Sequence, residues 1–134
     1  MYHKVILVGN LGRDPERGNT AAGKPVTHFS VATRERWTGS DGNTQERKVW
    51  WRVSAFGVLG KTCQEHLKVG HRVLVEGTLN ADPSTGAPPV WLAHDGKPRA
   101  SFELRAQVVK FLGGSKAEVG QPVTADLAKG DVPF

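Results

Sequence analysis

The sequence predicts an all-β domain of five short strands and one α-helix, followed by a tail of different character. Three observations lead to this prediction. Apolar and polar residues alternate with a period of two along several segments of the first 112 residues, which is typical of half-buried strands. The chain contains 16 Gly and 8 Pro residues, and both residue types disfavour the interior of a helix. One segment alone shows the apolar spacing of an amphipathic helix.

The first two strands are predicted at residues 4–9 and 26–37. Residues 4–9 are rich in apolar, β-branched side chains and end at the turn sequence Gly-Asn-Leu-Gly of residues 9–12. Residues 18–25 are expected to form a loop. In the second strand one face carries Phe29, Val31 and Thr33, and the other carries His28, Ser30, Ala32, Arg34 and Arg36.

The third strand is predicted at residues 48–56. It follows a polar loop at residues 38–44, which is too long for a tight hairpin. Alternation again separates two faces of the strand. One face carries Trp51, Val53 and Ala55, and the other carries Trp50, Arg52, Ser54 and Phe56.

The helix is predicted at residues 58–68. Leu59, Cys63 and Leu67 form one apolar stripe along it, and Gly70 is placed to cap its end. A fourth strand follows at residues 71–79, with Val73 and Val75 on one side and Leu74 and Glu76 on the other.

The last strand is predicted at residues 100–112, after a long and irregular ribbon. Residues 80–98 hold four Pro and two Gly around a short apolar strand at residues 90–93, which favours irregular edges. In the last strand the residues predicted to face inward are Phe102, Leu104, Ala106 and Val108.

Five short strands with one helix between the third and the fourth are the elements of an OB-fold, a small, partly open barrel. In such a barrel the helix closes one end. A β-sandwich is the alternative, but it would need about seven strands. We therefore expect an OB-fold domain at residues 1–112. Residues 113–134 have few apolar side chains and no clear period, which predicts a disordered, flexible tail.

Composition excludes several classes of protein. Cys63 is the single cysteine, so no intrachain disulfide or cysteine zinc cluster can form, and its place on the apolar stripe indicates a core residue. The five His residues lack metal-ligand spacing, and no acidic cluster suggests a metal-dependent enzyme. No apolar run approaches the roughly 20 residues of a membrane helix. We expect a cytoplasmic protein with no catalysis, cofactor, metal or membrane contact.

The basic charge is concentrated in the predicted domain. The whole chain has a net charge of +5. Residues 1–112 carry 16 basic and 10 acidic side chains, a net charge of +6, whereas residues 113–134 carry two basic and three acidic ones, a net charge of −1. This distribution favours a polyanionic partner for the domain.

Aromatic and basic side chains share the predicted strand faces, which indicates binding to single-stranded nucleic acid. Aromatic rings stack on unpaired bases for about 1–3 kcal/mol per base, and cations neutralise the phosphates, so such binding is largely sequence-tolerant. Trp50, Arg52 and Phe56 share one face of the third strand, and Arg34 with Arg36 could contact phosphates from the second. A buried Trp50 and a merely solvated arginine pair are the alternatives.

The other three Trp residues divide into two groups. Trp37, at the end of the second strand, and Trp91, in the ribbon, adjoin loops rich in Gly or Pro, and we expect both to be exposed and functional. Trp51 lies on the opposite face from Trp50, together with Val53 and Ala55. We expect Trp51 to be buried or to contact another subunit.

Residues 4–16, Lys-Val-Ile-Leu-Val-Gly-Asn-Leu-Gly-Arg-Asp-Pro-Glu, resemble the opening of the bacterial and mitochondrial single-stranded DNA-binding proteins (SSB). The resemblance spans about residues 3–112. Further matches are Phe-Ser-Val-Ala-Thr at 29–33, Trp-Arg-Val at 51–53 with Phe-Gly at 56–57, Leu-Lys-Val-Gly at 67–70 and Val-Leu-Val-Glu-Gly-Thr-Leu at 73–79.

The resemblance implies an OB-fold that assembles as a homotetramer and wraps single-stranded DNA in replication, recombination and repair. It also implies stacking aromatic residues near the end of the second strand, on the third strand and in the ribbon. Trp51 stands where the family often has a His near a subunit contact. The positions that match the family's stacking residues are Trp37, Trp50, Phe56 and Trp91.

The end of the chain resembles the short acidic tip, finishing Ile-Pro-Phe, with which the family docks replication and repair proteins. The tip here departs from that pattern, because one acidic residue adjoins it and Lys129 lies nearby. A frayed end without a partner is the alternative. The residues concerned are Asp131, Val132, Pro133 and Phe134.

Three other functions remain as alternatives. An SSB-like primosomal replication protein, or an OB module for structured RNA, would share the fold but generally lacks the Pro-Phe tip. A protein-interaction module would use the aromatic side chains to close an oligomer interface, and DNA-binding assays separate it from the leading prediction. An enzyme would need an acidic metal site.

Overall fold

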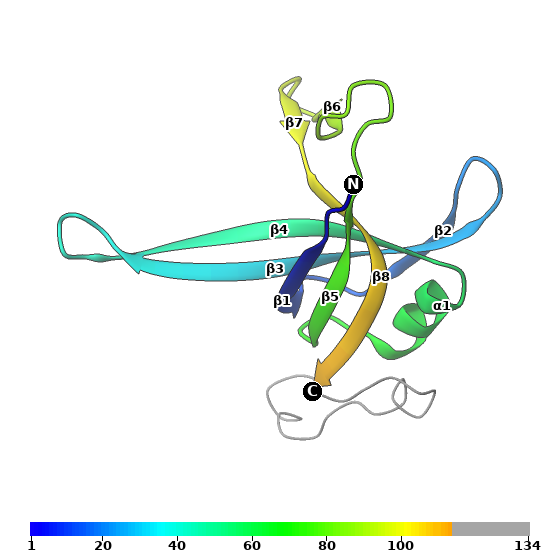
Figure 1. The fold of residues 1–134 in the computed structure, drawn as a ribbon, viewed down its shortest axis with the longest axis horizontal. Coiled ribbons are helices and arrows are strands. Elements are labelled where there is room, and N and C mark those ends of the chain that lie inside the picture. Colours follow the sequence, from blue (N-terminus) through cyan, green and yellow to red (C-terminus); the bar gives the residue numbers. More distant parts are fainter. Residues whose placement is uncertain (114–134) are drawn as a thin grey trace.

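The computed structural model describes residues 1–113 of the chain, and the predictions for the tail and for Asp131–Phe134 concern residues outside this range. The described part is built mainly of strands (Figure 1). The elements are β1 (Val5–Leu11), β2 (Glu16–Asn19), β3 (Pro25–Thr38), β4 (Thr44–Phe56), α1 (Gly57–His66), β5 (Arg72–Leu79), β6 (Val90–Leu92), β7 (Pro98–Ala100) and β8 (Phe102–Gly113).

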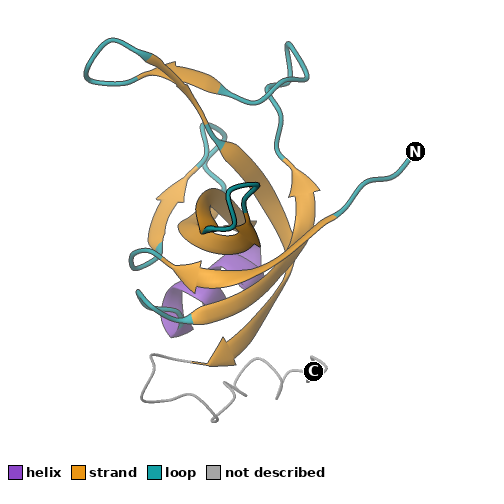
Figure 2. Cartoon of the chain, turned by 90° about the vertical axis from the view of Figure 1, so that its left-hand side faces the viewer, coloured by secondary structure: helices purple, strands orange, loops and turns teal. Residues whose placement is uncertain are grey.

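Five of these strands close into a barrel. Their order around the ring is β1-β5-β8-β4-β3, and β3 pairs back to β1. Figure 2 shows the strands curving around a common interior. Neighbours in the ring are antiparallel except β4 and β8, which are parallel. The predicted all-β OB-fold, with one helix after the third barrel strand, is confirmed.

Closure of the barrel depends on a close approach between β1 and β3. Residues 5–10 of β1 pair with β5, and at its end Asn10 and Leu11 pair with β3. Just before that switch, a Cβ atom on Gly9 would lie 2.2 Å from the carbonyl oxygen of Ala32. No side chain fits between two backbones at that distance, so glycine is needed here.

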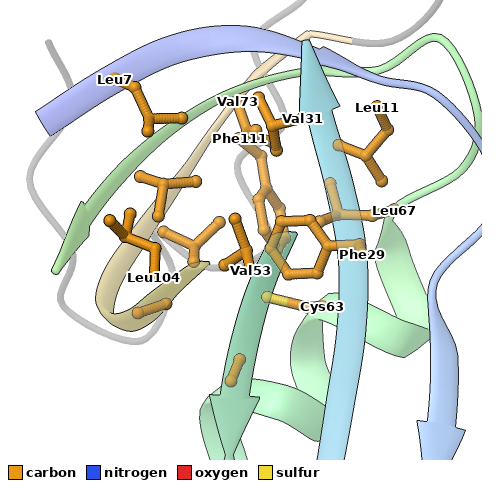
Figure 3. Packing of buried hydrophobic residues seen from close by; sticks show 14 residues of the cluster. Leu7, Leu11, Phe29, Val31, Val53, Cys63, Leu67, Val73, Leu104 and Phe111 are labelled. Carbon is orange, nitrogen blue, oxygen red and sulfur yellow. The ribbon is translucent and has the colours of Figure 1, made fainter. Parts of the chain in front are cut away.

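The core fills the barrel from every wall. Figure 3 shows Leu7, Phe29, Val53 and Leu104 converging from four strands on the same interior. The helix adds Cys63, which is fully buried and confirms its prediction as a core residue. Leu67, just beyond the helix, is also buried, and Leu59 packs against the cluster.

The helix ends earlier than its apolar stripe suggested. It stops at His66, and Leu67 is already extended. Gly70 does not cap the helix: it has a φ of 86° inside a turn closed by the His71 N–H donating to the Lys68 carbonyl at 3.0 Å. A positive φ at the third position of such a turn favours glycine, so this residue serves the turn.

Strands β3 and β4 extend far beyond the barrel as a hairpin arm (Figure 1). Their pairing continues without a break to Thr38 and Thr44, and residues 39–43 form the connection. Residues 34–38 and 44–48 are all exposed. The prediction that the third strand starts at residue 48 was therefore wrong by four residues, because an exposed arm has no apolar alternation to reveal it.

Two further strands lie in segments with no clear strand signal. Residues 16–19 form β2, which pairs with the start of β3, although residues 18–25 were predicted as a loop. Residues 98–100 form β7, which pairs with β6 in a separate two-stranded sheet. Both strands are three or four residues long and mostly polar or exposed, so alternation could not identify them.

A bulge in β8 reverses the predicted orientation of its second half. Glu76 pairs with Val108 and Gly77 with Ala106, which leaves Gln107 as the extra residue. Leu104 and Ala106 face inward as predicted, but beyond the bulge Val109 and Phe111 are buried in place of Val108. Phe102 was also predicted inward, and it is 55% exposed at the end of the barrel.

We predict that Gly9→Ala destabilises the fold by about 1–3 kcal/mol, because the added methyl group forces β1 away from the Ala32 carbonyl. Urea denaturation followed by circular dichroism measures this loss. Gly18→Ala is the matched control, since a Cβ atom there meets nothing within 4 Å, and its effect should stay within about 0.5 kcal/mol. Equal stability of the two variants would contradict the role of Gly9.

Candidate nucleic-acid interface

The outer face of β3 and β4 carries the predicted aromatic and basic residues in successive rows. The antiparallel register places Trp50 beside Ala32, Arg52 beside Ser30, Ser54 beside His28 and Phe56 beside Val26. The two aromatic rows are six residues apart on one strand, which corresponds to about 20 Å. Arg52, Ser54 and His28 occupy the space between them.

This face is hollowed into a continuous groove. Three hollows share lining residues along this face. Trp50 lines both the hollow beside Lys48 and the central hollow beside Arg13. The central hollow in turn shares Arg52, His28 and Trp91 with the hollow beside Phe56. Trp91 reaches the groove from β6 in the ribbon. The groove is defined by Arg34, Lys48, Arg72, Trp50, Arg13, Glu16, His28, Arg52, Trp91, Phe56 and Glu103.

The indole rings at the groove are accessible to a ligand. Trp50 is 50% exposed and Trp91 is 46% exposed, so about half of each side chain remains open to stacking. Phe56 is half-buried. The structure thus brings Trp50, Phe56, Trp91 and Arg52 to one groove. Alternation on the third strand predicts the shared face of Trp50, Arg52 and Phe56, whereas Trp91 was predicted to be exposed from its place in the ribbon.

Three of the predicted stacking residues already have a cation beside the ring. The Lys48 ammonium lies 5.7 Å from the Trp50 ring centre, and the Arg105 guanidinium lies 4.5 Å from that of Phe56. Arg47 lies 5.3 Å from the ring of Trp37. Sequence reasoning missed all three cations, although Lys48 stands two residues before Trp50 and so had to share its face.

Trp37 lies on the other side of the hairpin arm from the groove. It is 45% exposed, as predicted, but its neighbours are Arg47 and Glu35, which are hydrogen-bonded to each other at 2.8 Å. Arg36 precedes it and therefore points to the opposite face. The structure does not bring Trp37 together with Trp50.

Arg34 and Arg36 share one carboxylate. The Nε atom of each lies 3.3 Å from an oxygen of Glu46 on β4. All three side chains are about half exposed or more, so these pairs contribute at most about 1 kcal/mol each. Arg34 lines the groove, whereas Arg36 lies farther along the arm.

Trp51 borders one hollow of the groove together with Trp50, but it lies on the opposite face of β4, the face of the buried Val53 and Ala55. Its Nε1–H donates to the Thr33 hydroxyl at 2.9 Å, and its ring centre lies 5.5 Å from that of Phe102. It is partly buried and packs against the core cluster. The predicted packing role agrees with this geometry, and the subunit contact stays a prediction.

His28 is the titratable group at the centre of the groove. Its Nδ1 atom lies 3.0 Å from the Ser54 hydroxyl. Partial burial and, next, the positive charge of Arg52 lower the pKa of His28, while Glu103 and Glu16 oppose this shift. The lowered pKa favours the neutral form of the His28 imidazole.

The part of the chain that the structure describes contains no group of three His, Cys, Asp or Glu side chains placed to hold a metal ion. Within the same residues, no helix is long and apolar enough to cross a membrane.

Comparison with known proteins identifies the family. The model of the single-strand binding protein family matches residues 2–112. The chain belongs to this family. It is 44% identical to the single-stranded DNA-binding protein of Xanthomonas axonopodis pv. citri (strain 306) over 112 residues. The aligned segment covers 84% of this chain and 58% of that protein. The chain spans only 58–64% of the length of three such relatives.

Solved structures of other single-strand binding proteins share the fold. A Plasmodium falciparum SSB in complex with ssDNA matches with a TM-score of 0.66 at 23% identity, over 84% of this chain and 96% of that one. A small single-stranded DNA-binding protein from Streptomyces coelicolor matches with a TM-score of 0.64 at 22% identity, over 81% and 93%. At this level of identity the likeness shows the fold.

In this family member the residue that follows β1 also positions Trp50 in the groove. A Cβ atom on Gly12 would lie 2.4 Å from Cζ3 of Trp50. The edge of the indole therefore rests on the chain just beyond β1, where only a glycine leaves room for it. The turn that closes the barrel and the orientation of Trp50 are linked through this contact.

We predict that Gly12→Ala shifts the Trp50 ring without unfolding the domain, because the new methyl group occupies the space of the ring edge. Iodide quenching of tryptophan fluorescence should change. The same substitution in a Trp50→Phe background is the control and should change little. A change of equal size in both backgrounds would show that another indole responds.

Proposed function

We propose that the chain binds single-stranded DNA with little dependence on sequence. The observation that carries this proposal is the groove, where half-exposed Trp50 and Trp91 lie among Arg13, Lys48 and Arg52. The names of the family and of its relatives support single-stranded DNA as the ligand. Stacking on a ring face does not read the edge of a base, which makes the binding sequence-tolerant.

In the proposed complex, the aromatic rings and the cations of the groove bind different parts of the DNA. Bases stack on Trp50, Phe56 and Trp91, while Arg34 and Arg52 neutralise phosphates and release counterions. Trp37 and Arg36 extend the contact to the exposed arm. A binding role without catalysis is supported by the name of the family.

We further infer a homotetramer. Trp51 would lie near a subunit contact, as the family resemblance implies. Exposed apolar side chains support assembly, since Ile6 is 60% and Val8 48% exposed on the outer face of β1. Light scattering of the full chain measures the oligomeric state.

The tip of the chain is proposed to dock partner proteins of replication, recombination and repair in the cytoplasm, at the nucleoid. Sequence alone supports this part, through Asp131, Val132, Pro133 and Phe134. Their charge differs in sign from that of the domain, so the tip would not itself favour DNA.

We predict that oligo-dT quenches tryptophan fluorescence and that the affinity falls as salt rises, because phosphate contacts release counterions. Trp50→Ala and Trp91→Ala should each weaken binding by about 1–3 kcal/mol, the value of one stacked base. Denaturation midpoints close to that of the parent chain are the control for folding. No quenching by oligo-dT, or equal affinity for duplex DNA, would contradict the proposal.

Trp37→Ala is the matched indole variant, since its ring lies on the opposite face of the arm. A loss smaller than that of Trp50→Ala is expected if the groove is the main site.

We also predict that a chain ending at Leu112 keeps its affinity for oligo-dT, because every residue of the groove precedes this point. Fluorescence titration of the short and full chains at one salt concentration measures the difference. Loss of binding in the short chain would place part of the DNA site in the tail and contradict this assignment.

A further inference from the structure

His28 occupies the stretch of the groove between its aromatic platforms. It lies on the outer face of β3, in the row between Arg52 and Phe56. It lines both of the hollows that Trp91 also lines. A strand that stacks one base on Trp50 and another on Phe56 must carry its sugar-phosphate backbone across this row.

Charged groups of both signs surround the imidazole. Arg52 lies on β4, Glu16 on β2 is the direct cross-strand neighbour of His28, and Glu103 lies on β8. Arg13 lines the same hollow. In the free protein, burial and Arg52 prevail, and the pKa of His28 is below its ordinary value.

We propose that His28 is a further phosphate-binding residue, which takes up a proton as single-stranded DNA enters the groove. The inference rests on the proposed function. In the protonated ring both nitrogens are donors, so Nδ1–H donates to the Ser54 hydroxyl, 3.0 Å away, and Nε2–H becomes a donor for a phosphate oxygen.

The charges around His28 favour the uptake of a proton when DNA binds. A phosphate beside His28 adds a negative charge where Arg52 had added a positive one, and this raises the pKa of the ring in the complex. The free protein avoids the cost of a partly buried imidazolium next to a guanidinium. The complex gains a charge-assisted hydrogen bond.

The sign of the pH dependence follows from proton linkage. The complex holds more protons at His28 than the free protein does, so affinity rises as the pH falls through the pKa of the complex. It levels off once the pH is below the pKa of the free protein. Between the two values, one linked proton changes the association constant by up to about tenfold per pH unit.

The test is a fluorescence titration with oligo-dT between about pH 5.5 and 8 at constant ionic strength. Thymine does not titrate in this range, so the DNA does not contribute protons. The parent chain should bind more tightly at low pH. His28→Gln should bind like the parent near pH 8 and lose most of the slope. His66→Gln is the control, since this ring packs against Phe111 away from the groove, and it should keep the slope.

Calorimetry in two buffers of different ionisation enthalpy measures proton uptake on binding directly, which a purely structural role would not produce. Three results would overturn the proposal. The affinity of His28→Gln could keep the pH dependence of the parent chain, or the affinity of the parent chain could be independent of pH. His28→Gln could also lose affinity by the same factor at every pH. Each of these outcomes still includes binding of oligo-dT. If oligo-dT fails to bind the parent chain at any pH, the proposed function fails instead.

Discussion

The rest of the structure depends on the place where β1 leaves β5 and joins β3. Two residue pairs, Asn10 with Ala32 and Leu11 with Val31, turn a curved sheet into a closed ring. The ring leaves β1 without a free edge there and directs the inner side chains of β3 at the core. Because side chains alternate along a strand, the outer face of β3 and β4 is fixed at the same time. The groove is thus a consequence of barrel closure.

Closure also gathers distant parts of the chain at this outer face. Trp50 belongs to β4, whereas Trp91 comes from the ribbon between β5 and β8. The parallel pairing of β4 with β8 sets Arg105 beside Ser54, and its guanidinium then covers the ring of Phe56. No local pattern in the sequence announces a parallel pair, because each partner shows only its own alternation. Such contacts follow from register and topology together.

Local rules predicted much of the site and failed where geometry departs from them. A strict period of two placed Trp50, Arg52 and Phe56 on one face, and the register confirms it. The same rule places Trp37 on the opposite face of β3 from Arg34 and Arg36. The prediction for Trp37 concerned its exposure at the end of a strand and did not assign it to a face. The bulge at Gln107 inserts one residue and inverts the facing of every later residue in β8, and no residue type marks that insertion. The hairpin arm of β3 and β4 is exposed and shows no apolar alternation, so the start of β4 could not be predicted from the sequence.

The polar contacts of the groove are individually weak, and this suits the proposed role, in which the groove exchanges these contacts for contacts with DNA. Glu46 pairs with both Arg34 and Arg36, yet each exposed pair contributes at most about 1 kcal/mol. Lys48 beside Trp50 is a comparable case, since a cation near an exposed ring contributes about 0.5–1 kcal/mol. In the proposed complex, a base stacked on the ring of Trp50 would displace the Lys48 ammonium toward the phosphate at little cost. The cations are therefore kept close to the rings, and the interactions that keep them there are weaker than those that replace them.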